Sequence, residues 1–176
     1  MRFGFLTATP ERLQTTRLVL EPLEVRHAAE MTVVLADPEL HRHVGGRPLS
    51  LEELRTRYEH QVRGRSDDGA ERWFNWILRA GESGLAVGYV QATVGVATGI
   101  ADLAWVIGSP FQGNAFAGEA ASAMVEWLRR QGVVAVTAHL HPDNAASAAV
   151  ARAIGLAPSS TVVDGEVRWE LSPRVR

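Results

Sequence analysis

The sequence contains no cysteine and no lysine, and all 18 of its fixed positive charges are arginines. Without cysteine, the chain cannot form disulfide bonds, a thiolate nucleophile or a cysteine-ligated zinc site. Without lysine, it can form neither a Schiff base nor the phosphate-binding lysine of a P-loop. Covalent catalysis through sulfur or through a lysine amine is therefore excluded.

Strong net charge and long apolar runs are also absent. The net charge is −2 and the isoelectric point about 6.3, so the chain offers no basic field for a nucleic-acid backbone. No window approaches the roughly 20 consecutive apolar residues that a membrane span needs. Residues 1–10 lack the features of a signal peptide. We therefore expect a soluble cytoplasmic protein that binds neither nucleic acid nor a membrane.

What the sequence does contain is ordinary for a globular protein, with 46% hydrophobic and 22% charged residues among 176. This length fits one domain, residues 1–176, and we find neither an internal repeat nor a linker. Hydropathy periods typical of strands and of helices alternate along the chain, which predicts a mixed α/β domain. We expect strands at 17–23, 73–79, 85–93, 100–107, 133–140 and 169–171, and helices at 25–36, 50–62, within 111–132 and at 144–154.

The strongest local signal is the junction from Ile107 to Glu119. The apolar run at 100–107, typical of a central strand covered on both faces, ends there, and a helix begins after a turn of small residues. Such a junction presents several backbone N–H groups together with the positive end of a helix dipole, which suits an anion. Gly113 and Ala115 allow a phosphate to approach the backbone. Taken alone, the segment is equally typical of a purely structural turn.

Other segments extend this pattern over nearly the whole chain. Residues 112–117, Q-G-N-A-F-A, are similar to Gln/Arg-x-x-Gly-x-Gly/Ala except at Ala115, and residues 115–120 read A-F-A-G-E-A. Residues 15–23 read T-T-R-L-V-L-E-P-L, 37–40 read D-P-E-L, 50–53 read S-L-E-E and 144–156 read N-A-A-S-A-A-V-A-R-A-I-G-L. In these segments the chain resembles the GNAT superfamily of acyl-CoA N-acyltransferases. It is most similar to the branch of ribosomal-protein N-terminal acetyltransferases, the RimJ/RimL type.

The resemblance implies a single domain with a mostly antiparallel sheet, whose central strands splay apart to bind acetyl-CoA and are flanked by helices. It implies that the pantetheine arm pairs with the backbone of Trp105, Val106 and Ile107, and that Asn144 hydrogen-bonds the pantetheine or its neighbours. The residues that the resemblance assigns to the pyrophosphate are Gln112, Gly113, Asn114, Ala115, Phe116, Ala117 and Gly118. No metal is expected. A homodimer is expected only because dimers are common in the branch.

Ala115 departs from the pattern of the family, which usually has glycine at this position. A methyl group is tolerable there at negative φ, whereas positive φ would strain the backbone. A strained loop would weaken acetyl-CoA binding. The alternative to an enzyme is therefore a non-catalytic domain that binds or senses acyl-CoA.

Two residues are candidates for the proton transfers of an acyl transfer to an amine. Asp102 matches a position where many members of the branch have glutamate, and it would accept the amine proton directly or through water. It would need burial to raise its pKa for that role, and a carboxylate at a sheet surface is the structural alternative. Ser147 matches the serine of the branch's N-x-x-S pattern and would protonate or orient the thiolate. Its alternative is a small residue chosen for helix packing.

Two histidine pairs remain. His139, His141 and Asp143 have a spacing that could chelate a metal, although polar residues at a strand end are more common. His141 is also a candidate proton acceptor on the substrate side. His41 and His43 lie in the loop expected to frame the acceptor. The two pairs form one centre only if the fold brings them together.

Tryptophans and arginines complete the candidates. We expect Trp73, Trp76, Trp105 and Trp127 in the core or in a dimer interface. The arginines that either select a carboxylate-bearing acceptor or are simply solvated are Arg42, Arg47, Arg63, Arg65 and Arg72.

The function expected from these observations is direct acetyl transfer from acetyl-CoA to a primary amine, without a covalent enzyme intermediate. A protein N-terminal α-amino group is favoured by the branch and by its pKa near 8, against about 10.4 for a lysine amine. Small-molecule amines are nearly as well supported, because a fold does not name a substrate. A metal-dependent hydrolase built on the histidines is a third, weaker alternative.

Overall fold

The computed structural model describes residues 4–43 and 45–171, and all strands of this part belong to one sheet. The strands are β1 (Leu13–Gln14), β2 (Leu18–Pro22), β3 (Glu71–Ala80), β4 (Ala86–Gly95), β5 (Ile100–Ile107), β6 (Ala135–Leu140), β7 (Leu156–Val163) and β8 (Glu166–Leu171). The α-helices are α1 (Ala28–Val34), α2 (Leu51–Gln61), α3 (Phe116–Arg130) and α4 (Ala145–Ala153). Short 3-10 turns include η2 (Val25–His27), η3 (Pro38–His41) and η4 (Ser109–Phe111). The predicted mixed α/β fold is confirmed.

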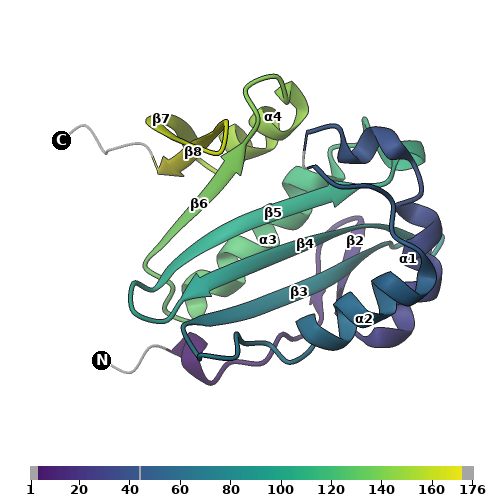
Figure 1. The fold of residues 1–176 in the computed structure, drawn as a ribbon, viewed down its shortest axis with the longest axis horizontal. Coiled ribbons are helices and arrows are strands. Elements are labelled where there is room, and N and C mark those ends of the chain that lie inside the picture. The colour runs from purple at the N-terminus through teal and green to yellow at the C-terminus, as the bar shows by residue number, and fades with distance from the viewer. Residues whose placement is uncertain (1–3, 44, 172–176) are drawn as a thin grey trace.

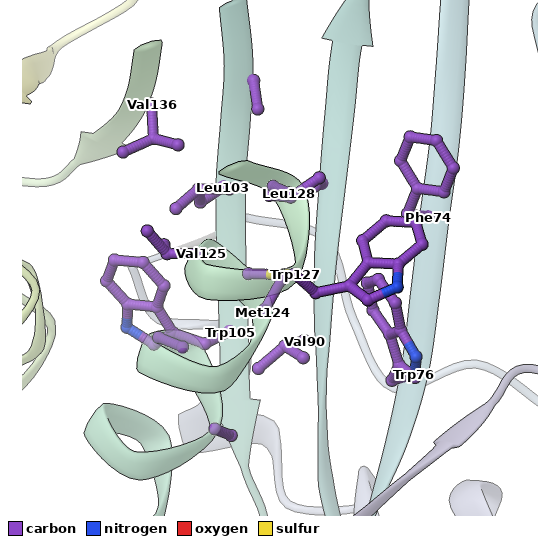
Figure 2. Packing of buried hydrophobic residues seen from close by; sticks show 14 of the residues in the cluster. Phe74, Trp76, Val90, Leu103, Trp105, Met124, Val125, Trp127, Leu128 and Val136 are labelled. Carbon is purple, nitrogen blue, oxygen red and sulfur yellow. The ribbon is translucent and has the colours of Figure 1, made fainter. Parts of the chain in front are cut away.

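Helices cover the sheet unequally. α3 lies behind β4 and β5, whereas α1 and α2 cover the other face where β3 and β4 meet (Figure 1). The main core lies between the sheet and α3, where Trp127 packs edge-on against Phe74 and Trp76 with ring centroids 5.1 and 5.2 Å away (Figure 2). Trp105 is buried in the same core, as expected. Trp73 is half-buried and stacks on His60 instead.

The central strands diverge, as the resemblance implied. Neighbouring strands run antiparallel except β5 and β6, which pair in parallel only over Ile100–Leu103 and Ala135–Ala138. Beyond that point β5 keeps its pairing with β4, while His139 and Leu140 of β6 pair with β8. Figure 1 shows β5 and β6 separating toward the end where α4 lies. Residues 104–107 therefore have no strand partner on the β6 side.

Two details of the predicted elements are wrong. The run at 100–107 was expected to be covered on both faces, yet only Ala101, Leu103, Trp105 and Ile107 are buried, under α3. The opposite face of β5 is only partly covered, since α1 and α2 lie farther along the sheet. β7 was not predicted, because it is an exposed edge strand interrupted near Pro158, where a register shift occurs.

Local signals in the sequence explain two boundaries of these elements. Ser50 and Glu53 form a capping box at the start of α2. Asp164 and Gly165 both have positive φ, 51° and 82°, in the turn between β7 and β8. No helix of the described residues has the length and apolar character that crossing a membrane requires.

Candidate active site

A cavity of about 750 Å³ opens where β5 and β6 part. We call it the splay cavity. Its walls are the end of β5, the loop before α3 and the first turns of α3 and α4. Ser147 lines it. So do all the residues that the resemblance assigned to acetyl-CoA, which are Trp105, Val106, Ile107, Gln112, Gly113, Asn114, Ala115, Phe116, Ala117, Gly118 and Asn144. The fold therefore gathers these residues around one space.

The loop before α3 presents its backbone to the splay cavity. In the described part of the chain, none of the N–H groups of residues 113–118 donates to a protein acceptor. The two amide side chains of the loop turn inward instead: Gln112 Nε2 donates to the Ile107 carbonyl at 3.0 Å, and Asn114 Nδ2 donates to the Phe111 carbonyl at 2.9 Å. Free N–H groups at the start of a 15-residue helix suit an anion.

Ala115 has positive φ, which is the strained one of the two conformations that the sequence analysis considered for it. Its φ and ψ are 60° and 21°, in the left-handed region, and it is the N-cap residue of α3. For alanine this conformation costs about 1 kcal/mol, a penalty that glycine would avoid. The turn is nevertheless formed, with Gly113 also at positive φ.

Glu119 fixes the first turn of α3 to the N-terminal strands. Its carboxylate accepts a hydrogen bond from the Thr15 hydroxyl at 2.6 Å and from the Arg17 backbone N–H at 2.9 Å, and it forms an ion pair with the Arg17 guanidinium at 2.7 Å. Burial opposes ionisation of Glu119, but these bonds outweigh it and lower the pKa. The motifs at 15–23 and 115–120 were both noticed in the sequence, whereas this contact between them was not, since it joins residues about a hundred positions apart.

At the start of α4, Asn144 is partly committed to the helix. Its Oδ1 accepts the Ser147 N–H at 3.0 Å as an N-cap, which leaves its Nδ2 as the available donor. The Ser147 hydroxyl lines the splay cavity and makes no hydrogen bond with the described residues. Both groups can therefore serve a ligand.

Asp102 lies on the less covered face of β5 and lines neither of the two cavities described here. Its Oδ1 lies 2.9 Å from His139 Nδ1 and accepts the Thr137 hydroxyl at 3.1 Å. The side chain of Asp102 remains 49% exposed, so the burial expected around it is not found. The structure instead couples Asp102 to His139, at the residue where β6 leaves β5.

The four candidate histidines do not share one centre. The rings of His43 and His141 lie 5.3 Å apart, His139 contacts Asp102, and His41 lines a different cavity from His43.

Among the described residues, one group could bring three ligand atoms to a metal ion: Glu21, Glu24 and His27. Its carboxylates are already paired with Arg26, and Glu21 also with Arg79. These two guanidinium charges oppose a bound cation.

A second cavity, of about 350 Å³, lies on the face covered by α1 and α2. We call it the open-face cavity. Side chains of α1, α2, β3 and β4 form its walls, together with His41 of the loop that was expected to frame the acceptor. Leu40 and Val106 line both cavities, so the two spaces meet there.

Comparison with known families identifies the family of the chain. A family model described as the acetyltransferase (GNAT) domain matches residues 17–157. The chain therefore belongs to the GNAT acetyltransferases, and the predicted membership is confirmed. No curated protein sequence matches the chain.

Solved structures show the same fold at low sequence identity. A GNAT-family acetyltransferase from Bacillus anthracis has a TM-score of 0.77 and 14% identity, over 92% of this chain and 98% of that one. RimL, a ribosomal L7/L12 alpha-N-protein acetyltransferase in complex with coenzyme A, has a TM-score of 0.76 and 18% identity, over 91% and 96%. The microcin C7 self-immunity acetyltransferase MccE, in complex with acetyl-CoA and AMP, has 0.76 and 14%, over 92% and 96%.

Proposed function

We propose that the protein is an acetyl-CoA-dependent N-acetyltransferase that acts directly on a primary amine, either a protein N-terminal α-amino group or a small molecule. The observation that carries the proposal is the meeting of two unsatisfied backbone surfaces in the splay cavity. These are the unpaired edge of β5 at 104–107 and the free N–H groups at 113–118. Family membership and the presence of coenzyme A or acetyl-CoA in RimL and MccE support it.

The chemistry of acetyl-CoA fits both surfaces. Its pantetheine arm carries amide groups that can pair with a strand edge, and its pyrophosphate is an anion suited to a helix N-terminus. Residues 105–107 would hold the arm, residues 112–118 the pyrophosphate, and Asn144 Nδ2 a pantetheine carbonyl. When bound, acetyl-CoA supplies an activated thioester.

We infer that Asp102 acts through His139. A neutral imidazole that donates Nδ1–H to the Asp102 carboxylate presents the lone pair of Nε2 as a proton acceptor. His139 is the first residue of β6 beyond its pairing with β5, on the same face of the sheet as Asp102. His139, like Asp102, lines neither cavity, so Nε2 accepts the proton that the amine must lose through an intervening water, and Asp102 stabilises the resulting imidazolium.

Ser147 serves the second proton transfer. Its free hydroxyl in the splay cavity donates a proton toward the sulfur that leaves as a thiolate. No side chain forms a covalent bond with the acetyl group, consistent with a chain that has neither cysteine nor lysine.

The first experiment is thermal unfolding with acetyl-CoA, free CoA and adenosine. A ligand at about 100 times its dissociation constant adds about 2.7 kcal/mol of apparent stability. We expect a clear rise in Tm with acetyl-CoA and CoA and none with adenosine. No rise at millimolar acetyl-CoA would refute the cofactor site.

The second experiment separates binding from catalysis. Asp102→Asn, His139→Gln and Ser147→Ala are each expected to lower kcat about 100-fold while acetyl-CoA affinity changes little. Acetyl-CoA consumption against a panel of amines, together with calorimetric titration, measures both. Tight acetyl-CoA binding without turnover of any amine would favour the non-catalytic acyl-CoA-binding alternative.

A further inference from the structure

The open-face cavity is where an acceptor would meet the thioester, because it joins the splay cavity at Leu40 and Val106. Its volume of about 350 Å³ lies at the lower end of the range for small-molecule sites. Such a space suits a molecule of a few hundred daltons.

The charge around the open-face cavity has one sign. No aspartate or glutamate of the described residues lines it, whereas Arg47 and Arg57 do. Arg47 is already bound to Glu53, at 3.0 and 2.6 Å. Arg57, an exposed residue of α2, has no ion pair with any carboxylate of the described residues. One guanidinium is thus left for an anionic group of the ligand.

The walls of the open-face cavity are largely apolar and aromatic. Leu54 and Tyr58 of α2 pack with Ile77 of β3, and all three are at most 4% exposed. Tyr89 completes this wall, and burial raises the pKa of the Tyr58 and Tyr89 phenols, so both remain uncharged. Among the described residues, the side-chain amides of Asn75 and Gln91 have no hydrogen-bond partner and can meet the polar atoms of a ligand.

The distance between Val106, where the two cavities adjoin, and Arg57 limits the shape of the ligand. Val106 lies on β5, whereas α2, which carries Arg57, lies over β3 (Figure 1). Strands lie about 4.8 Å apart, so the junction and α2 are separated by two strand spacings, on the order of 10 Å. An amine at the junction and an anion at Arg57 must therefore be joined by an extended apolar body.

We propose that the acceptor is a small primary amine joined to a carboxylate through an apolar body of about dipeptide size, with the carboxylate bound by Arg57. This substrate class rests on the proposed acetyl transfer. In the reaction the amine nitrogen bonds to the acetyl carbonyl carbon and the carbon–sulfur bond breaks. The neutral amine reacts and its nitrogen gives one proton to His139, while the departing thiolate takes one from the Ser147 hydroxyl. His139 then returns its proton through water to the Ser147 oxygen, so both side chains regain their starting state. The products are an N-acetylated carboxylate and CoA.

The test compares the dipeptide Leu-Phe with Leu-Phe amide, which has nearly the same size but no carboxylate. For the wild type we expect kcat/KM about 10-fold higher for the dipeptide, through a lower KM. Arg57→Gln should abolish this preference and leave the amide unaffected. Arg55→Gln is the matched control, because Arg55 lies on the same helix, pairs with Glu52 and does not line the open-face cavity.

Calorimetric titration of both peptides into the CoA-loaded protein adds a readout that does not need turnover. Binding of the dipeptide that depends on Arg57, without acetylation, would support a carboxylate site at Arg57 but overturn this class of molecule as the acceptor. Acetylation of dipeptide and amide with equal kcat/KM would support the proposed transfer and overturn the carboxylate site. Equal losses in the Arg55 and Arg57 variants would also overturn the role of Arg57.

Discussion

The two cavities of this protein are formed by different groups, the splay cavity largely by backbone and the open-face cavity by side chains. The splay cavity owes its polar character to consecutive backbone N–H groups at 113–118 and to a strand edge without a partner. The open-face cavity owes its character to side chains that come from several distant elements and only meet in the fold. A backbone site constrains the conformation of a short segment, whereas a side-chain site constrains the packing of distant ones. The first can be altered by changing φ and ψ, and the second by changing contacts.

Gly88→Ala is expected to have the largest effect, because it displaces Val106, one of the two residues that line both cavities. A Cβ at position 88 would lie 2.1 Å from the Val106 carbonyl oxygen and 3.0 Å from Ile107 Cα. Both are backbone atoms, so β4 and β5 would have to separate. We expect the free energy of unfolding to fall by about 3 kcal/mol, with loss of acetyl-CoA affinity. Urea unfolding and calorimetric titration measure the two quantities.

Gly118→Ala is the control for that prediction. Its Cβ would meet only Ala153 Cβ, at 3.9 Å, an ordinary contact. Inside a helix the same replacement adds about 1 kcal/mol of stability. If Gly88→Ala unfolds at the same urea concentration as the wild type, the close approach of β4 to Val106 is wrong.

Ala115→Gly is expected to affect the splay cavity, which is formed by backbone groups, and not the open-face cavity. Release of the left-handed strain is expected to raise the free energy of unfolding by about 1 kcal/mol and to tighten acetyl-CoA binding. The open-face cavity should be unchanged, so KM for the amine should not move. Ala117→Gly, within α3, should instead cost about 1 kcal/mol. Equal destabilisation by both changes would contradict the strained turn.

Acid should destabilise the region of β2 and η2, which packs against α1 and α2, with the smallest effect of the changes considered. Burial opposes the charge of Glu21, but hydrogen bonds from Arg79 and Arg26 outweigh it and lower its pKa from 4.5 to about 2. Burial lowers the pKa of His27 below its ordinary 6.5, so the folded state holds this imidazole neutral. The unfolded chain therefore takes up protons first, and stability falls as the pH drops below 6.5 and again between 4.5 and about 2.

Urea midpoints between pH 7 and pH 3 check this expectation. His27→Gln should flatten the part of the curve just below pH 6.5, and Glu21→Gln should lower the midpoint at pH 7 by about 0.3 M. A wild-type midpoint that is constant down to pH 4 would exclude the contribution of His27.

The comparison also explains how much the sequence could predict. The bounds of 100–107 match β5, and every residue implied for acetyl-CoA lines one cavity, because those signals lie within short segments. The contact of Asp102 with His139 depends on the register that places Leu103 beside Ala138, which no local pattern encodes. Arg57 was not singled out, since an exposed arginine on an amphipathic helix resembles any solvated one.

The short parallel pairing of β5 with β6 has a consequence for the proposed proton transfers. Four residue pairs join the two strands, from Ile100 with Ala135 to Leu103 with Ala138. His139 and Ser147 both belong to the part of the molecule beyond this junction, while the strand edge and the N–H groups of the splay cavity belong to the other part. The positions of the proposed base and acid therefore depend on this short pairing, and the contacts of Asp102 with Thr137 and His139 reach across it.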